Sequence, residues 1–152
     1  MSLKNKMPAK LEYKNPASTS SMIVEKDNSV YLVLRKHDPY KGMWALPGGF
    51  LNCDRENLEQ TAVRELKEET ALDTKLEDLE LLCVNSSPNR DPRGHVIDHV
   101  YIVKEYSGIP NAGDDAAKLR LFSLNNLPQL AFDHGQVLEK YKIWRQKNEK
   151  LS

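Results

Sequence analysis

Three glutamates, spaced to share one helix face, are the residues of this 152-residue chain best suited to chemistry. Glu65, Glu68 and Glu69 lie in a segment predicted to be a helix over about 58–71. At about 100° per residue, Glu68 and Glu69 fall near −60° and +40° of Glu65. Carboxylates this close repel one another, so a neutralising partner is expected, and a hard divalent cation suits such a cluster. A solvated, charged helix face is the alternative for this pattern taken alone.

Basic and capping residues of the same segment define its geometry further. Lys67 falls near 200° and points away from the glutamates, whereas Arg64, near −100°, lies beside Glu68 and can orient a carboxylate. Asn57 is the expected N-cap, and Gln60 completes a capping-box pattern. The helix is therefore predicted to begin at residue 58.

A double glycine precedes this helix. Gly48 and Gly49 follow the strand-like run Trp44–Pro47. At two glycines the backbone can turn sharply, approach a ligand closely and direct a carbonyl at a cation. A simple turn explains the Pro-Gly-Gly stretch alone, but a metal site explains it better when it is taken with the glutamates.

Together with Glu56, these residues resemble the signature of the Nudix hydrolases. Glu56, a seven-residue interval, the run 64–70 and Leu72 match that signature as they stand. There are two departures: six residues rather than five separate Gly49 from Glu56, and Ala71 replaces the last glycine. The second departure costs about 1 kcal/mol if the left-handed conformation is kept.

The resemblance covers about residues 20–147 and is closest to the ADP-ribose pyrophosphatase-like branch. It implies hydrolysis of a nucleoside diphosphate linked to another moiety, with ADP-ribose giving AMP and ribose 5-phosphate as the leading case. It implies Mg²⁺ or Mn²⁺ as cofactor, held by Glu65, Glu68, Glu69 and the carbonyl of Gly48. Gly49 is expected to contact the substrate. The expected catalytic residues are Glu65, Arg64, Glu68, Asp114 and Asp115, and the base that removes the proton is Glu65 or one of the two aspartates.

Two loops carry further candidates. Arg90 and Arg93 flank a proline turn, where planar donors can bind a diphosphate or a terminal phosphate, although solvated loop arginines are an equal alternative. Asp114 and Asp115 follow Gly113, and in the family an acidic residue of such a loop can reach the metal centre. Capping of a turn is the alternative for the aspartates.

Histidine and aromatic residues complete the candidates. His134 begins the last predicted helix beside Asp133, its expected N-cap, and packing is favoured over catalysis for it. Trp44 and Phe50 can stack on a base, but core positions are favoured for both. Contacts of the substrate with the loop at 37–40, which contains His37 and Tyr40, are a weaker expectation.

The elements that must position these residues alternate along the chain. Strand-like runs occur at 21–25, 30–35, 79–85, 96–106 and 118–122, and helices at about 58–71 and 134–147. We therefore predict an α/β fold, which the resemblance specifies as a Nudix-type α/β/α sandwich with a mixed β-sheet flanked by helices. Residues 1–20 are expected to be a flexible N-terminal arm, and residues 21–148 the Nudix hydrolase domain.

Composition limits the remaining choices. Lys+Arg and Asp+Glu both number 22, so no global field attracts nucleic acid or an anionic membrane. A small nucleotide is the expected partner, the cytoplasm the expected location, and the resemblance allows a homodimer. The two cysteines do not form a disulfide framework. Two other functions stay open: a hydrolase that removes damaged nucleoside triphosphates, and a non-catalytic nucleotide-sensing module.

Overall fold

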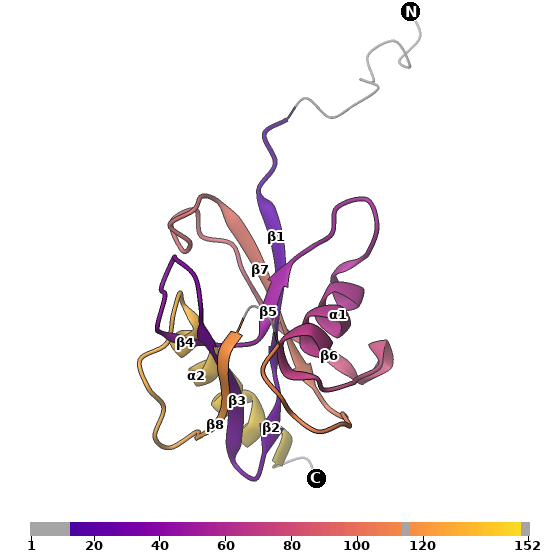
Figure 1. Cartoon of the computed structure of the whole chain (residues 1–152), viewed down its shortest axis with the longest axis vertical. Helices are drawn as coiled ribbons and strands as arrows, with labels where there is room; N and C mark the ends of the chain where they lie inside the picture. Colours follow the sequence, from indigo (N-terminus) through magenta and orange to yellow (C-terminus); the bar gives the residue numbers. More distant parts are fainter. Residues whose placement is uncertain (1–12, 114–115, 150–152) are drawn as a thin grey trace, which may run out of the picture.

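In the computed structural model, residues 13–113 and 116–149 are described, and Asp114 and Asp115 lie outside them. The described residues form two four-stranded sheets, two α-helices and a short 3-10 helix, η2 (Leu76–Asp78) (Figure 1). The first sheet has the order β5 (Gly48–Phe50), β1 (Ala17–Ile23), β7 (Val96–Val103) and β6 (Leu79–Asn85). Only the β1–β7 pairing in it is parallel, so the sheet is mixed.

The second sheet is antiparallel and is built around β3. It comprises β2 (Glu25–Lys26), β3 (Ser29–Arg35), β4 (Trp44–Ala45) and β8 (Ala116–Ser123). The predicted α/β class is confirmed, but the strands divide between two sheets where the sequence indicated one. The strand-like run at 44–47 contains β4, whereas β5, which contains the double glycine, was missed because three residues give no periodic signal.

Two helices cover opposite faces of the first sheet. α1 (Leu58–Thr70) and α2 (His134–Glu149) lie on either side of β1 in Figure 1. One buried cluster joins Met22 and Tyr101 to Leu66 of α1, and the other joins Ile23 and Val100 to residues of α2. Successive residues of a strand point to opposite faces, so β1 and β7 supply both halves of an α/β/α sandwich.

The first strand begins earlier than the sequence indicated. β1 starts at Ala17, four residues before the predicted strand and inside the segment expected to be an arm. Thr19 and Ser21 donate hydrogen bonds of 2.8 and 2.9 Å from their hydroxyls to Oδ1 of Asp98, a residue of β7. The polar half of this strand is thus buried by pairing, which an apolar pattern cannot reveal. The arm over residues 1–12 lies outside the described residues.

Helix α1 begins and ends as its sequence requires. The Asn57 side chain accepts from the Gln60 N–H at 2.8 Å, and the Gln60 side chain accepts from the Asn57 N–H at 2.9 Å, so the capping box is confirmed. Ala71 ends the helix in the left-handed conformation, at φ 64° and ψ 7°, and donates its N–H to the Lys67 carbonyl. The conformation of the replaced glycine is therefore kept.

No helix within the described ranges, 13–113 and 116–149, is long and apolar enough to cross a membrane. Cys53 and Cys83 are both free thiols, as the sequence indicated.

Candidate functional site

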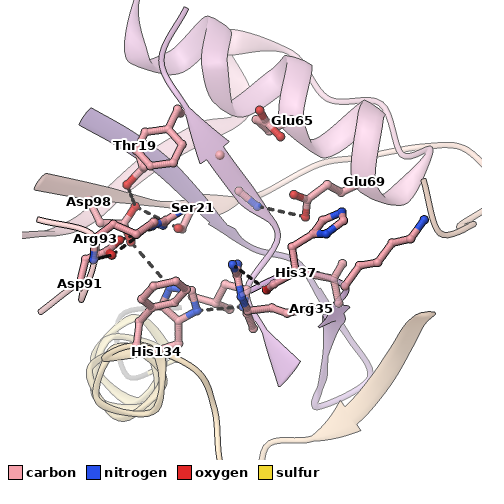
Figure 2. Close-up of a pocket in the computed structure, with 18 of the residues that line it drawn as sticks. Thr19, Ser21, Arg35, His37, Glu65, Glu69, Asp91, Arg93, Asp98 and His134 are labelled. Atoms are coloured by element: carbon pink, nitrogen blue, oxygen red, sulfur yellow. Dashed lines mark hydrogen bonds and ion pairs between the residues drawn. The ribbon is translucent and has the colours of Figure 1, made fainter. Parts of the chain in front are cut away.

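A cavity of about 410 Å³ opens where the two sheets meet α1 and the start of α2. Its lining includes β1, the end of β3, the double glycine, α1 and the loop at 90–93 (Figure 2). The structure brings most of the predicted site residues to it, namely Gly48, Gly49, Arg64, Glu65, Glu69, Arg90 and Arg93.

The double glycine packs directly against two glutamates of α1. A Cβ added at Gly49 would collide with the Glu65 carboxylate, and one at Gly48 would collide with the backbone of β1. The Gly48 N–H points at Oε2 of Glu69, at 3.4 Å. Figure 2 shows Glu65 and Glu69 extending from the helix beside this strand. Glycine is therefore needed at position 49 for the backbone to approach the Glu65 carboxylate, and at position 48 for it to pack on β1.

Arg64 holds three carboxylates at the edge of the cavity. Its guanidinium donates to Glu56 at 2.8 Å, to Glu65 at 2.9 Å and to Glu68 at 3.1 Å. The hydrogen bonds from Arg64 are the main reason that the pKa of Glu56 falls to about 2. The same bonds raise the pKa of Arg64. The expected orienting role of Arg64 is thus seen in its contacts.

Glu68 is placed differently from the other two glutamates. Its side chain is 54% exposed, against 13% for Glu65, and it does not line the cavity. The i,i+4 contact with Arg64 directs its carboxylate towards that guanidinium. The role of Glu68 as a metal ligand stays a prediction.

The donor chemistry around the double glycine fits a hard divalent cation. Glu65 and Glu69 bring carboxylate oxygens to one cavity beside the Gly48 backbone, and Arg64 forms an ion pair with Glu65 there. Carboxylate and carbonyl oxygens are the ligands that Mg²⁺ and Mn²⁺ prefer. Within 13–113 and 116–149, however, no three His, Cys, Asp or Glu side chains are gathered as a metal cage.

The predicted fourth acidic group comes from the loop after Gly113. Gly113 donates its N–H to the carbonyl of Glu69 at 3.1 Å, and Asn111 donates to the carbonyl of Thr70 at 2.8 Å. The loop is therefore tied to the end of α1 just before Asp114 and Asp115, which fall outside the described residues.

The two loop arginines already have carboxylate partners. Arg90 makes two 2.8 Å bonds to Asp133, and its side chain is only 5% exposed. Arg93 binds Asp91 through two nitrogens, at 3.1 and 2.8 Å, and stacks over the ring of Phe50. Arg90 is therefore not a solvated loop residue, whereas Arg93 is 40% exposed but paired. Burial alone would raise the pKa of Asp91, but the bonds and charge of Arg93 lower it below its usual value.

Three buried side chains, those of Arg90, Asp98 and His134, form the floor of the cavity. His134 is 5% exposed, and its Nδ1 accepts the N–H of Leu46 at 3.0 Å, so the neutral ring carries its proton on Nε2. That nitrogen lies 3.9 Å from Oδ2 of Asp98, which has no hydrogen-bond partner among the described residues. Burial lowers the pKa of His134. The carboxylate of Asp133, the expected N-cap, binds Arg90.

The aromatic candidates separate into core and cavity. Trp44 packs against the core and makes an edge contact with Phe122 at 4.8 Å, as expected. Phe50 is 41% exposed and lines the cavity, so its expected core position is wrong. Its strand is an edge strand of the first sheet, and the guanidinium of Arg93 lies 4.8 Å from the centre of its ring. His37 lines the cavity, and Tyr40 packs on Phe132.

Several lining residues were not identified from the sequence. Arg35, Asp98 and Phe132 reach the cavity from β3, β7 and the loop before α2. The hydrogen bonds that bury Asp98 join residues 77 and 79 positions apart in the chain. Only a charged residue inside an apolar strand pattern pointed to Asp98, and nothing local distinguished Arg35.

Comparisons with known proteins agree with this geometry. The NUDIX domain profile matches residues 14–141. An ADP-ribose pyrophosphatase of Methanocaldococcus jannaschii is 50% identical over 133 residues, which are 88% of this chain and 77% of that protein.

Two solved structures are similar as well. The NUDIX domain of Shewanella oneidensis NrtR, in complex with ADP ribose, has a TM-score of 0.77 and 29% identity, with 99% of this chain and 97% of that chain covered. A bifunctional NMN adenylyltransferase/ADP ribose pyrophosphatase of Francisella tularensis, in complex with AMP and a Mn ion, has a TM-score of 0.71 and 35% identity. The match covers 90% of this chain and 43% of that chain.

Proposed function

This chain belongs to the Nudix family, and from that premise we propose that it is a metal-dependent pyrophosphohydrolase that cleaves ADP-ribose to AMP and ribose 5-phosphate. The single observation that carries the proposal is the packing of Gly48–Gly49 against the carboxylates of Glu65 and Glu69 at one cavity. The half-identical archaeal ADP-ribose pyrophosphatase supports the choice of substrate.

In this proposal, Glu65, Glu68, Glu69 and the Gly48 carbonyl would hold Mg²⁺ or Mn²⁺, as the Mn ion in the Francisella structure supports. When bound, the cation supplies neutralisation of the diphosphate oxygens and acidification of a water molecule. Arg64 orients Glu65 and Glu68 through its two Nη1 contacts. Gly49 leaves room for the Glu65 carboxylate and would contact the substrate through its backbone, and Glu65, Asp114 or Asp115 would accept the proton of the attacking water.

Phosphoryl chemistry of this kind depends on position and charge more than on a covalent nucleophile. The chain's own contribution is therefore to fix the carboxylates beside the turn and to exclude bulk water from the cavity floor. The buried contacts of Leu46 with His134 and of Pro47 with Met22 hold the turn in place.

A substrate panel tests the proposal. Phosphate-containing products would be measured for ADP-ribose, NADH, other nucleotide sugars, dinucleoside polyphosphates and 8-oxo-dGTP, each with Mg²⁺ and with Mn²⁺. We expect ADP-ribose to have the highest kcat/KM, with AMP and ribose 5-phosphate as products. Preferred cleavage of the oxidised triphosphate would support the sanitising hydrolase instead.

The non-catalytic sensing module makes a different prediction. It would bind ADP-ribose, as the Shewanella domain does, without product formation in either metal. The cavity carboxylates favour the enzyme, because a sensor has no need of acids packed against a glycine turn. A cytoplasmic location, no nucleic-acid or membrane partner, and pairing into a homodimer belong to the same proposal, and sedimentation of the purified chain would test the pairing.

A further inference from the structure

Four arginines line the cavity, and one of them differs from the others in its partners. Arg64, Arg90 and Arg93 each bind at least one carboxylate at 3.1 Å or less. Arg35 takes part in none of the ion pairs among residues 13–113 and 116–149. It is thus the one cavity arginine whose charge no carboxylate of the described chain offsets at contact distance.

The backbone of Arg35 is held on both sides. It is the last residue of β3, its N–H donates to Met43 and its carbonyl accepts from Gly42, both at 2.9 Å. The register of β3 with β8 shifts between Leu34 and Arg35. Such an irregularity re-aims a side chain at the end of a strand. The direction of the Arg35 side chain is therefore set by the sheet.

The side chain uses only part of its hydrogen-bonding capacity. Nε donates to the Pro39 carbonyl at 2.6 Å, and Nη2 reaches the His37 carbonyl at 3.5 Å. A guanidinium has five N–H donors, so the Nη1 pair has no acceptor within the described residues. The two carbonyls bind the Nε–Nη2 edge of the guanidinium. The centre of the Phe132 ring lies 5.0 Å from the Arg35 Cζ atom, and the ring covers one face of the guanidinium. In the view of Figure 2, Arg35 lies between His134 and Glu69.

The electrostatic surroundings make a counter-ion favourable at this place. Burial, followed by the charge of Arg93, lowers the pKa of Arg35. The charges of Glu69, Asp91 and Asp38, none of them in ion-pair contact with it, oppose this lowering of the pKa only in part. Arginine nevertheless stays charged, and a partly buried charge without a close partner is costly. An anion that enters the cavity would remove that cost, and a planar guanidinium matches the oxygens of a phosphate group.

We propose that Arg35 binds a phosphate group of the substrate's diphosphate through its Nη1 edge, in the cavity that Glu65 and Glu69 line. This inference rests on the proposed function for the identity of the substrate and not for the anion site itself. Arg90 and Arg93, which the sequence suggested for this task, are held by Asp133 and Asp91 and shape the cavity wall. Among the four cavity arginines, Arg35 is the one with an N–H pair left to contact the substrate.

The variants Arg35→Gln and Arg35→Lys test the proposal against Arg120→Gln as a matched control. Arg120 is on the neighbouring strand β8 and also stacks on aromatic rings, Trp44 and Phe122, but it does not line the cavity. We expect Arg35→Gln to raise the KM for ADP-ribose about 10- to 100-fold, the effect of losing one charge-assisted contact. The KM of Arg35→Lys should lie between those of the wild type and Arg35→Gln, and the KM of Arg120→Gln should equal that of the wild type.

Binding of inorganic phosphate and of AMP, measured by calorimetry in a chelator, separates this proposal from the proposed function. We expect Arg35→Gln to weaken both ligands and Arg120→Gln to weaken neither, whether or not the wild-type chain cleaves ADP-ribose. Equal phosphate affinity in the wild type and both glutamine variants would overturn the proposal that Arg35 binds a phosphate group. A fall in kcat with unchanged KM and unchanged phosphate affinity would overturn it too. If Arg35→Gln does not fold, the phosphate affinity of Arg35→Lys decides in the same way.

Discussion

Two arginines organise acids on opposite sides of the cavity, and they do so under different conditions. Arg64 gathers Glu56, Glu65 and Glu68 on α1, and its side chain is 26% exposed; we call this the Arg64 cluster. Arg90 binds Asp133 near Asp98 and His134, and its side chain is 5% exposed; we call this the Arg90 cluster.

The difference in exposure assigns different tasks to the two clusters. Ion pairs that water reaches contribute little to stability, so the Arg64 cluster chiefly orients carboxylates. A buried pair contributes little when complete, but removing one partner leaves an unpaired buried charge. The Arg90 cluster therefore maintains the fold under the cavity, whereas the Arg64 cluster orients the carboxylates proposed to hold the metal. Variants in the two clusters should separate activity from stability.

The largest effect is expected for Glu65→Gln in the Arg64 cluster. Loss of a proposed ligand charge should lower kcat by about two to four orders of magnitude. The free energy of unfolding should stay the same or rise, because an acid is removed from a crowded face. Rates on ADP-ribose and denaturant unfolding measure the two quantities. Glu59→Gln is the matched control on the same helix, since Glu59 contacts Tyr101 and does not line the cavity.

A turnover of Glu65→Gln close to that of Glu59→Gln would contradict the proposed metal site. A large loss of stability would contradict the division of tasks between the clusters.

In the Arg90 cluster the effect should fall on stability instead. Arg90→Met leaves Asp133 and Asp98 without their cation and should lower the free energy of unfolding by about 3–5 kcal/mol. Glu68→Gln, at the 54% exposed end of the Arg64 cluster, should change it by less than about 0.5 kcal/mol. Urea unfolding of both variants measures the contrast, and equal losses would show that exposure does not distinguish the clusters.

The same contrast explains what the sequence could predict. Arg64, Glu65 and Glu68 lie within one helix, and helix geometry places their contacts from spacing alone. The capping box and the left-handed end at Ala71 are equally local. Helix α1 and its acidic face were therefore predictable, and so was the turn before it.

The Arg90 cluster was not predictable in that way. Arg90 and Asp133 are 43 positions apart, and they meet only because the sheet brings the 90–93 loop beside the start of α2. Arg35 reaches the cavity through a register shift that no pattern of residues announces. Phe50 is aromatic in an apolar run, and its exposure depends on β5 being an edge strand. Long-range pairing decides all three.

His134 provides a smaller test of the buried cluster, through pH. Burial lowers its pKa below 6.5, against the opposing charges of Asp98 and Asp133 and with the help of Arg90 and Arg35. Below pH 6.5 the unfolded chain therefore takes up a proton that the folded chain does not. Stability should be complete above that pH and fall as the pH drops, by at most about 1.4 kcal/mol per unit from this residue.

Urea unfolding between pH 7.5 and 5.5 measures how steeply the free energy of unfolding changes with pH. His134→Gln keeps an acceptor for the Leu46 N–H but cannot titrate, so its slope should be shallower than that of the wild type. Identical slopes would show that His134 takes up its proton as readily in the folded chain as in the unfolded chain, against the expectation from its burial.

The smallest effect is expected at the end of α1, outside both clusters. Ala71 holds φ at 64°, a conformation that costs an alanine about 1 kcal/mol and a glycine little. Ala71→Gly should therefore raise the free energy of unfolding by about 0.5–1 kcal/mol, after the added freedom of glycine in the unfolded chain is subtracted. Because Ala71 touches neither cluster's ion pairs, kcat on ADP-ribose should stay unchanged. Ala62→Gly, at a fully buried position inside the same helix, should destabilise the chain by more than about 1 kcal/mol, because it loses helix propensity and a buried methyl. The opposite signs of the two variants in thermal unfolding would show that the gain at Ala71 depends on its left-handed conformation.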